Sequence, residues 1–272
     1  MTERRFLVPA VLAFLSLAAV ASAQTASEPF TPTPGMAGKD SVWVPTTPEL
    51  IEKMLDVAKV TPKDYVIDLG SGDGRMVIAA AKRGARAHGV EYNPDMVALS
   101  KKAAAEAGVS DRATFAEGDM FEADISQATV MALFLMPENL RRLTPSFLDL
   151  RPGSRIVVNT LGIPEWQPDL VERLEPCQSW CEAKLYIVPA KVAGTWTLPE
   201  GSLVLEQTFQ HLTGTLTKDG QSLPIEDGVV KGSRISLKAG GQAYEGRIKG
   251  GHIDLTVTSG NGRQRLTARR AD

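Results

Sequence analysis

The chain has 272 residues, of which 43% are hydrophobic, so it is long enough to bury a sizeable core and to form two modest domains. It carries 30 lysine and arginine residues against 32 aspartate and glutamate residues, which gives a net charge of −2. This balance excludes a chain-wide basic field of the kind that attracts nucleic acid or anionic lipid to a whole protein.

The N-terminus has the pattern of an export signal. Arg4 and Arg5 precede an almost wholly apolar run over residues 6–20, and small residues at 21–23 match a cleavage site. The run is shorter than the roughly 20 residues that span a bilayer. We therefore predict a signal peptide over 1–23, a periplasmic or secreted protein, and no integral membrane span after cleavage. An uncleaved signal would instead anchor the chain in the membrane.

The segment over 24–41 is rich in proline and poor in apolar residues, which predicts a disordered linker. Ordered structure is expected to begin near Val42, and from there to about Pro189 short apolar runs alternate with helical patterns. Pro48, after a capping threonine at position 46 or 47, is expected to begin the first helix. The next predicted strands cover 65–69, 87–91, 113–116, 129–136 and 155–159, and the next predicted helices cover about 75–83 and 94–107.

Strands that alternate with helices predict a parallel sheet with right-handed crossovers. The apolar run over 129–136 suits a central strand that is covered on both faces. Segments 170–175 and 183–189 are expected to form an antiparallel hairpin that closes the sheet. The fold predicted for 42–190 is therefore a doubly wound, mostly parallel, Rossmann-like α/β domain.

Two cysteines, Cys177 and Cys181, flank the tip of this hairpin. An exported protein meets an oxidising compartment, so a small disulfide across the turn is expected. A reactive thiol pair is the alternative, although the four-residue spacing fits no CxxC redox motif.

The chain changes character after position 190, where helical periodicity disappears. Alternating segments are separated by turn signals of antiparallel hairpins, among them Gly240-Gly241 and Gly250-Gly251. Residues 191–272 are therefore predicted to form a small antiparallel all-β domain of about six strands, as a sandwich or barrel with an unknown partner. Its last segment holds arginines that form either a basic patch or, as we favour, a solvated strand face: Arg263, Arg265, Arg269 and Arg270.

The stretch VIDLGSGDGR, residues 66–75, places glycines at 70, 72 and 74 in the first strand-to-helix turn. Ligands of doubly wound sheets bind at the carboxyl ends of the strands, where this turn lies. Because glycines lack Cβ atoms, the backbone can turn sharply and a nucleoside can lie close to it, while N–H groups at the helix start favour an anionic group. The turn therefore predicts a ligand with a flat part and an anionic end.

Three cofactors compete for such a turn. A nucleoside triphosphate loop would end in Gly-Lys-Ser/Thr, whereas this one ends in Gly74-Arg75-Met76. A dinucleotide fingerprint has the spacing G-x-G-x-x-G, whereas this turn has G-x-G-x-G with Asp68 two residues before the first glycine. The spacing resembles the first motif of class I S-adenosylmethionine-dependent methyltransferases.

Two more acids test that resemblance. Glu91 ends the next strand, within the usual distance of roughly 20 residues past the turn at which a carboxylate grips ribose hydroxyls. Asp119 follows the third strand, where class I methyltransferases often use a carboxylate to receive the adenine amino group. A helix cap or a solvated loop would explain any one of these acids, but three acids at the carboxyl ends of strands favour a shared site.

A narrower resemblance covers about Val42 to Trp166. VWVPTTPELIEKML, VIDLGSGDGRMVIAAAKRGA and GVEYNPDMVALSKKAA are similar to successive motifs of the family that includes the lysine methyltransferases of the ATP synthase c-subunit and the adenine nucleotide translocase. The resemblance implies S-adenosyl-L-methionine as cofactor, a protein lysine as acceptor, and closure of the segment around Val44-Pro45-Thr46 over the site. The predicted cofactor-binding residues are Asp68, Gly70, Ser71, Gly72, Glu91 and Asp119.

The segment after the fourth strand limits the acceptor. Enzymes that methylate nucleobase or glutamine amides commonly carry Asp/Asn-Pro-Pro-Tyr there, whereas this chain has Phe-Leu-Met-Pro-Glu-Asn over 134–139. This difference disfavours nucleic acid as a substrate or partner. No catalytic residue is assigned. Candidates for lining the acceptor slot are Glu138 and Asn139, for which a helix cap is the alternative, Asn159, and Trp166, for which core packing is the alternative.

His88, His211 and His252 are scattered, so no metal site is predicted. Two other functions stay open beside the lysine methyltransferase. The export signal motivates an exported binding or envelope protein with a non-catalytic methyltransferase-like domain, because S-adenosylmethionine is made in the cytosol. A small-molecule methyltransferase is the second alternative. The glycine turn and the three acids together favour a catalytic protein.

Overall fold

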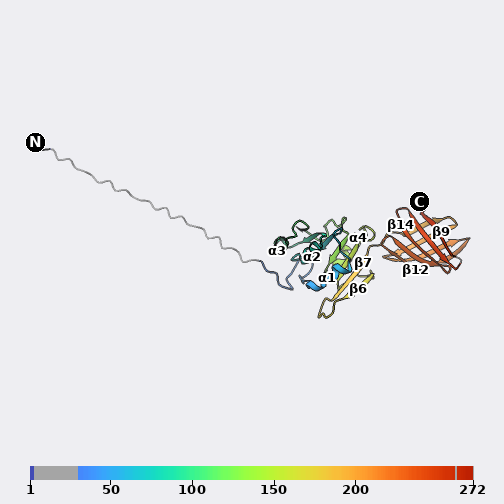
Figure 1. Ribbon diagram of the computed structural model, residues 1–272, viewed down its shortest axis with the longest axis horizontal. Coiled ribbons are helices and arrows are strands. Elements are labelled where there is room, and N and C mark those ends of the chain that lie inside the picture. Colours follow the sequence, from blue (N-terminus) through green and yellow to red (C-terminus); the bar gives the residue numbers. More distant parts are fainter. Residues whose placement is uncertain (3–29, 261, 272) are drawn as a thin grey trace. The chain divides into compact units, whose positions relative to one another are not determined.

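A computed structural model of the chain describes residues 1–2, 30–260 and 262–271 (Figure 1). The helices and strands lie in the unit that begins at residue 32. Nearly all of the predicted signal peptide lies outside the described residues. Within the described part of the chain, no helix combines the length and the apolar character that crossing a membrane requires.

The first sheet has the strand order β3-β2-β1-β4-β5-β7-β6. Strands β3 to β5 are parallel, whereas β7 runs antiparallel to both β5 and β6. Its strands are β1 (Tyr65–Leu69), β2 (Arg86–Glu91), β3 (Ala113–Glu117), β4 (Val130–Leu133), β5 (Arg155–Asn159), β6 (Leu170–Arg173) and β7 (Glu182–Ile187). The helices are α1 (Pro48–Val57), α2 (Arg75–Lys82), α3 (Pro94–Glu106) and α4 (Pro137–Leu148). The predicted doubly wound, mostly parallel fold is confirmed.

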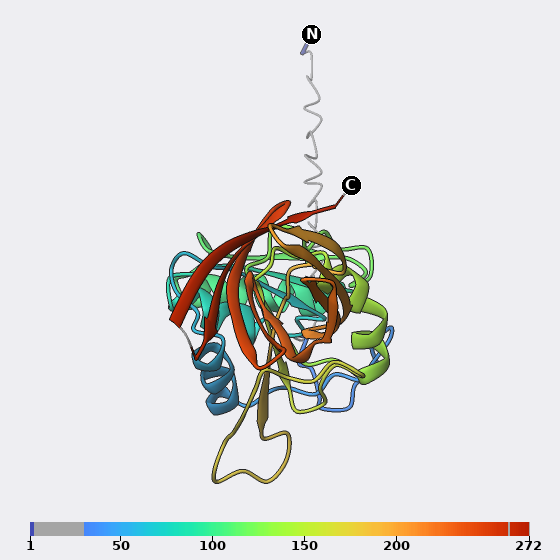
Figure 2. The ribbon, with the colours of Figure 1, turned by 90° about the vertical axis from the view of Figure 1, so that its right-hand side faces the viewer.

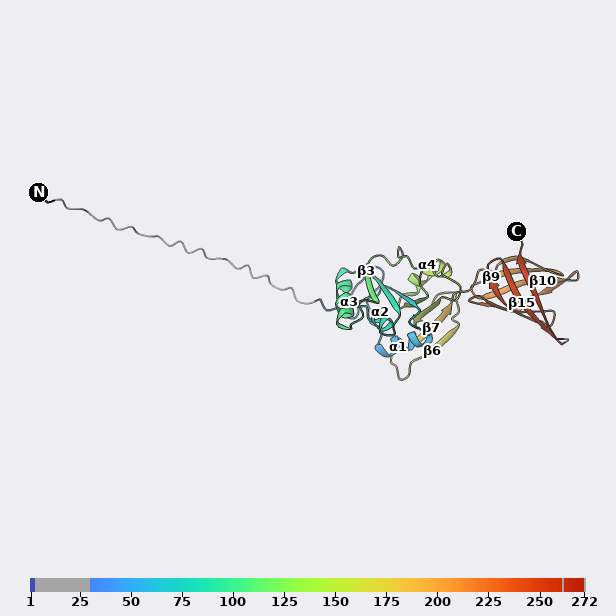
Figure 3. The ribbon, with the colours of Figure 1, turned by 45° about the horizontal axis from the view of Figure 1, so that its top comes forward.

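Alternation along the strands divides the core into two layers, because successive side chains of a strand point to opposite faces. Val66 of β1 packs with apolar residues of α1, α2 and α3, whereas Ile67 and Leu69 pack with those of α4. Figure 3 labels these helices around the sheet. Helix α1 begins as predicted, with Pro48 in its first turn and the Thr47 side chain accepting a hydrogen bond from the Leu50 amide at 3.4 Å.

The fourth strand is shorter than predicted. The mostly apolar run over 129–136 was expected to form it, but β4 ends at Leu133, and Phe134 and Leu135 lie in the connection to α4. Leu135 is buried against the glycine turn: a Cβ atom at Gly70 would lie 3.3 Å from its side chain. Part of this apolar segment is therefore a loop that packs on the glycine turn and does not belong to the strand.

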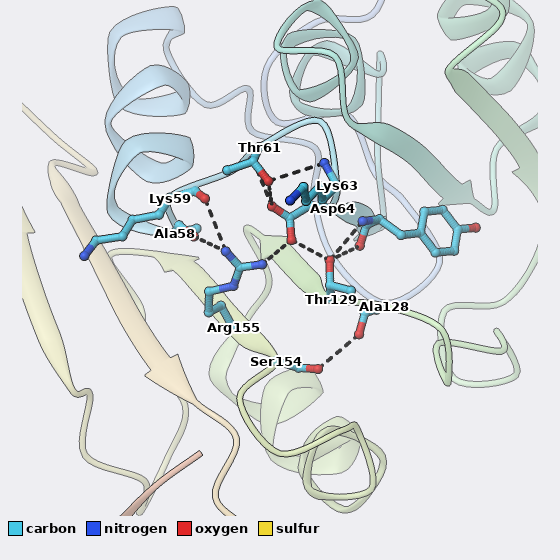
Figure 4. Close-up of polar contacts among 10 residues, drawn as sticks. Ala58, Lys59, Thr61, Lys63, Asp64, Ala128, Thr129, Ser154 and Arg155 are labelled. Atoms are coloured by element: carbon cyan, nitrogen blue, oxygen red, sulfur yellow. Dashed lines mark hydrogen bonds and ion pairs between the residues drawn. The ribbon is translucent and has the colours of Figure 1, made fainter. Parts of the chain in front are cut away.

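The amino ends of β1, β4 and β5 are joined by a polar network around Asp64 (Figure 4). This buried carboxylate accepts hydrogen bonds from the Thr61 amide at 2.8 Å and the Thr129 hydroxyl at 2.8 Å, and it forms an ion pair with Arg155. Burial acts to raise the pKa of Asp64, but these hydrogen bonds and the Arg155 charge outweigh it and lower that pKa. The network fixes the end of the sheet opposite to the glycine turn.

The second sheet has the order β11-β10-β12-β13-β14-β15-β16-β8-β9, and β9 also pairs with β10, so the sheet closes on itself (Figure 2). Its strands are β8 (Gly194–Leu198), β9 (Gly201–Thr208), β10 (His211–Lys218), β11 (Gln221–Pro224), β12 (Glu226–Lys231), β13 (Arg234–Ala239), β14 (Gln242–Lys249), β15 (His252–Ser259) and β16 (Gly262–Arg270). The predicted antiparallel all-β character is confirmed, and of the two predicted forms the sheet has the barrel, although about six strands was too few. Trp196 and Tyr244 are the large aromatic residues of its core.

The two sheets meet at a small aromatic and polar junction. Phe209 stacks on Trp166 with ring centroids 5.2 Å apart and an interplanar angle of 8°. The Gln210 side-chain amide donates to the Gln167 carbonyl at 2.8 Å, and the Ala190 amide donates to the Gly232 carbonyl at 2.8 Å. Trp166 is therefore a packing residue of this junction.

Candidate active site

A cavity of about 960 Å³, with its open mouth included, lies at the carboxyl ends of β1, β2 and β4. Its wall contains every predicted cofactor-binding residue: Asp68, Gly70, Ser71, Gly72, Glu91 and Asp119. These residues come from three separate strand ends, and the parallel topology brings them to one edge of the sheet. The structure thus places the predicted set around a single cavity.

The glycine turn is held in a conformation that suits residues without a side chain. Gly70, Gly72 and Gly74 have φ angles of +68°, +55° and +78°. The amides of Gly70 and Ser71 donate to the Val90 carbonyl at 2.8 and 3.1 Å, which ties the turn to β2. The Ser71 hydroxyl is buried in the cavity wall and has no hydrogen-bond partner within the described residues. The turn is thus held against β2 by its own backbone hydrogen bonds.

Glu91 is oriented by two backbone amides. One carboxylate oxygen accepts from Gly72 N–H at 2.9 Å and the other from Asn93 N–H at 3.0 Å. Because each carboxylate oxygen has a second lone pair, both oxygens can still accept hydrogen bonds from a ligand. Two fixed acceptors beside a glycine turn suit a pair of neighbouring hydroxyl groups.

Asp68 is the buried acid of the site, with 7% of its surface exposed. Burial raises its pKa well above the ordinary value, and the nearby charges of Glu91 and Asp73 raise it further. A positively charged ligand would offset that cost and stabilise the ionised carboxylate. The electrostatics at this end of the cavity therefore favour a cation.

Asp119 also lines the cavity, and Lys39 forms an ion pair with it. The Lys39 hydrogen bond, followed by one from the Phe121 amide at 2.9 Å, lowers the pKa of Asp119. Lys39 also lies over the ring of Tyr92, with 4.9 Å from its nitrogen to the ring centroid. The ionised carboxylate of Asp119 can accept a hydrogen bond from an amino group.

A folded segment over 35–46, which we call the strap, forms part of the cavity wall. The Trp43 amide donates to the Met36 carbonyl at 2.8 Å, and the Gly35 amide donates to the Trp43 carbonyl at 2.9 Å. Residues 35–41 were expected to belong to a disordered linker, and the structure differs there. The prediction of disorder rested on local composition. It was wrong here because the strap gains its order from contacts with distant residues.

Trp43 and Arg75 attach the strap to the glycine turn. A Cβ atom at Gly72 would lie 2.5 Å from the indole nitrogen of Trp43, so the ring lies directly against the turn. Arg75 donates to the Thr46 carbonyl at 3.0 Å and lies over the Trp43 ring at 5.9 Å. Asp73 in turn holds the Arg75 guanidinium through hydrogen bonds of 2.6 to 3.0 Å. The absent Cβ of Gly72 thus makes room for the strap.

An aromatic pair lies beside the cavity at the end of β4. Phe134 lines the cavity, and its ring packs edge-on against Trp180 with centroids 5.4 Å apart. Trp180 is 42% exposed and lies in the loop closed by the predicted Cys177–Cys181 disulfide, which the structure confirms. Neither aromatic residue was predicted to lie at the site, although a tryptophan enclosed between two cysteines was a visible signal in the sequence.

The predicted acceptor-slot candidates lie outside the cavity wall. Trp166 is core packing, and Glu138 is exposed and forms an ion pair with Arg141. Asn139 donates to the Asp40 carbonyl at 3.3 Å, and Asn159 donates to the Thr46 hydroxyl at 3.2 Å. Both asparagines therefore hold the strap through side-chain hydrogen bonds.

Comparison with known proteins identifies the domain that carries this cavity. A protein-family profile described as the ANTKMT methyltransferase domain matches residues 68–170. A protein-lysine N-methyltransferase of Saccharolobus islandicus is 37% identical over 149 residues, which are 54% of this chain and 92% of that protein. The lysine N-methyltransferase of the ATP synthase c-subunit from Mus musculus is 34% identical over 171 residues, 62% of this chain and 66% of the mouse protein.

A solved structure supports the same assignment. It is described as an RNA methyltransferase from Salinibacter ruber in complex with S-adenosyl-L-homocysteine; its identity to this chain is 40% and the TM-score is 0.52. The match covers 55% of this chain and 96% of that one. The chain therefore belongs to the family of S-adenosylmethionine-dependent methyltransferases that contains these protein-lysine N-methyltransferases.

Proposed function

We propose that this enzyme transfers a methyl group from S-adenosylmethionine to the side-chain amine of a protein lysine. The observation that carries the proposal is the cavity that unites the glycine turn with Asp68, Glu91 and Asp119. The chain that forms it is 37% identical to a protein-lysine N-methyltransferase and covers 92% of that protein's length. The named relatives, which are protein-lysine N-methyltransferases, support lysine as the acceptor.

The cavity residues fit S-adenosylmethionine. Glu91, with both oxygens fixed by amides, would hold the two ribose hydroxyls. Asp119 would accept from the adenine amino group, in place of its present contact with Lys39. Asp68 would face the cationic methionine end, because a cation offsets the unfavourable ionisation of this buried carboxyl. When bound, the cofactor supplies an electrophilic methyl group on a sulfonium.

The chain's own contribution is mainly alignment and exclusion of water, since an in-line displacement needs the reacting atoms held in one geometry. The acceptor lysine must first lose its proton, because an ammonium has no lone pair. Phe134 and Trp180 offer an apolar approach to the cavity. Partial burial beside these rings would lower the pKa of the incoming lysine and favour the neutral amine.

An RNA acceptor is the second candidate, because the 40% identical relative is described as an RNA methyltransferase. The residues after β4 argue against it: Phe134 to Asn139 lack the Asp/Asn-Pro-Pro-Tyr sequence whose carbonyl accepts from a planar base nitrogen. An apolar wall at this position suits an alkyl amine better than a base amide.

The deciding experiment is a transfer assay. Purified enzyme and methyl-labelled S-adenosylmethionine are incubated with protein and RNA fractions of cells that lack the gene, and the labelled products are hydrolysed. The proposal expects label in ε-N-methylated lysine from protein. Label confined to nucleotides or to small molecules would refute the lysine acceptor, and a Glu91→Ala enzyme serves as the inactive control.

A further inference from the structure

The closed sheet presents five arginines on one outer face. Along β13 to β16, alternate residues such as Ile235, Leu237 and Ala268 are buried in the core, and the residues between them face outward. Five of the outward positions, all exposed, hold the arginines that we call the basic face: Arg234, Arg247, Arg263, Arg265 and Arg269.

Strand pairing joins these positions into one surface. Arg234 of β13 is opposite Arg247 of β14, which is opposite Asp254 of β15, and Asp254 is opposite Thr267 of β16. Thr267 lies between Arg265 and Arg269, and alternate residues of a strand are about 6.8 Å apart. In the sequence the first and last of these arginines are far apart, so the arginines of the last strand alone suggested an ordinary solvated face.

The positive charge of this face is largely uncompensated. Neighbouring lysines are paired, Lys238 with Asp227 at 2.7 Å and Lys249 with Asp254 at 2.9 Å. Within the described part of the chain, no ion pair includes an arginine of the basic face. Among the described outward positions of β13 to β16, Glu245 is the one acid outside those pairs. A local positive field therefore exists on a chain whose net charge is −2.

The chemistry of the face favours a ligand that carries many phosphate groups. The guanidinium group binds phosphate through two parallel hydrogen bonds, which suits arginine to this ligand. Single-stranded nucleic acid is usually held by aromatic stacking in addition to charge, and the outward positions of β13 to β16 hold no Phe, Tyr or Trp. The arginines are spread over three strands and an outer sheet surface. We propose that the basic face binds an anionic phospholipid surface and holds the enzyme at a membrane.

Vesicle partitioning tests this proposal independently of methyl transfer. The full chain is sedimented with vesicles of phosphatidylcholine and with vesicles that also contain phosphatidylglycerol, and the ratio of the two partition coefficients is measured. The ratio removes the contribution that the apolar N-terminal run makes to binding of both vesicles. Each basic residue near an anionic surface strengthens binding about fivefold, so we expect a ratio well above about tenfold that falls as salt is raised.

Matched charge variants locate the effect. Arg263→Glu combined with Arg265→Glu should lower the ratio at least about tenfold, with the unfolding temperature measured to confirm that the exposed strand still folds. Lys101→Glu combined with Lys102→Glu makes the same charge change at exposed positions of α3 and should leave the ratio nearly unchanged. If the double arginine variant fails to fold, Arg247→Gln serves in its place. The proposal is overturned by a ratio near one, by an equal fall in the lysine variant, or by a DNA duplex that displaces the protein from vesicles at equal phosphate concentration.

Discussion

At the scale of single residues, the site contains an acid whose ionised form is unfavourable in the protein without a ligand. Asp68 of β1 is buried, and its burial, with the charges of Glu91 and Asp73, raises its pKa. A carboxyl in this environment stays protonated above its ordinary range until a cation arrives. Binding of a sulfonium ligand should therefore release a proton, and affinity should rise with pH across that range.

Asp68→Asn separates the effect of this residue on the stability of the fold from its effect on cofactor affinity. In the unliganded wild type, the folded state holds a proton that the unfolded chain has lost, so the free energy of unfolding falls as pH rises through the window between the ordinary and the raised pKa. The variant lacks this dependence. Its melting temperature relative to wild type should therefore increase as pH rises above the ordinary pKa of an aspartate, while its affinity for S-adenosylmethionine drops about 100-fold. Thermal unfolding against pH would contradict the account if the difference decreased.

Trp180 should act on the acceptor and not on the cofactor. Its ring contacts Phe134, which lines the cavity, and its exposure leaves it accessible to an incoming protein. Trp180→Ala is expected to raise KM for the methylated protein about tenfold, because it removes aromatic contact area at the mouth. Trp180→Phe keeps part of that area and should recover part of the effect. A change in the cofactor Kd of Trp180→Ala, with KM for the acceptor unaltered, would be evidence against this role.

At the scale of elements, the glycine turn and the strap behave as one unit. Gly72 has a φ of +55°, and a side chain there would meet the indole of Trp43 at 2.5 Å. Gly72→Ala should thus cost about 1–2 kcal/mol of unfolding free energy from the backbone alone. It should also displace the strap and weaken cofactor binding at least about tenfold.

Gly108→Ala is the matched control for that variant. Gly108 follows α3 with a φ of +68°, and a Cβ atom there would have nothing within 4 Å. The backbone cost should be similar, while cofactor affinity should stay at the wild-type value. Equal losses of cofactor affinity in the two variants, measured by calorimetry, would mean that the Trp43 contact has no part in binding.

Elements whose signals are local were predictable, and those that depend on distant contacts were not. Strand β1 was predicted to the residue, since its apolar run and the glycine turn that ends it occupy neighbouring positions in the sequence. The cavity-lining position of the segment around Val44-Pro45-Thr46 was expected from the family resemblance. The order of the preceding residues 35–41 was missed, because the strap is held by Trp43 against Gly72 and by Arg75 at Thr46. Strand β4 was predicted to extend beyond its actual end at Leu133, because Phe134 and Leu135 are apolar. These two residues line the cavity and do not continue the sheet.

The candidate site follows the same rule. The acids and glycines that the sequence predicted come from recurring positions in the strand ends, and all of them line the cavity. Trp180 and Lys39 reach the site from a disulfide loop and from the strap, and neither position follows from the order of helices and strands. Only the folded chain shows that these segments converge.

At the scale of the whole molecule, the export signal is a prediction from the sequence that can be tested independently of the cavity. Protein recovered from the cell envelope should begin at Gln24, because the small residues at 21–23 match a cleavage site. Mass determination of the N-terminal peptide checks this directly. An intact N-terminus on protein from the envelope would show that the apolar run is retained as an anchor, and recovery from the cytosol alone would show that it directs no export.

The most direct test of the account is a calorimetric titration of the full chain with S-adenosylmethionine. We expect one ligand per chain, with affinity lowered at least about 100-fold in Glu91→Ala, because the amide-held carboxylate of Glu91 makes charge-assisted hydrogen bonds. Glu117→Ala, at an exposed acid that ends β3, should bind as the wild type does. Absence of binding to the wild type, or equal binding by Glu91→Ala, would contradict the assignment of this cavity to the cofactor.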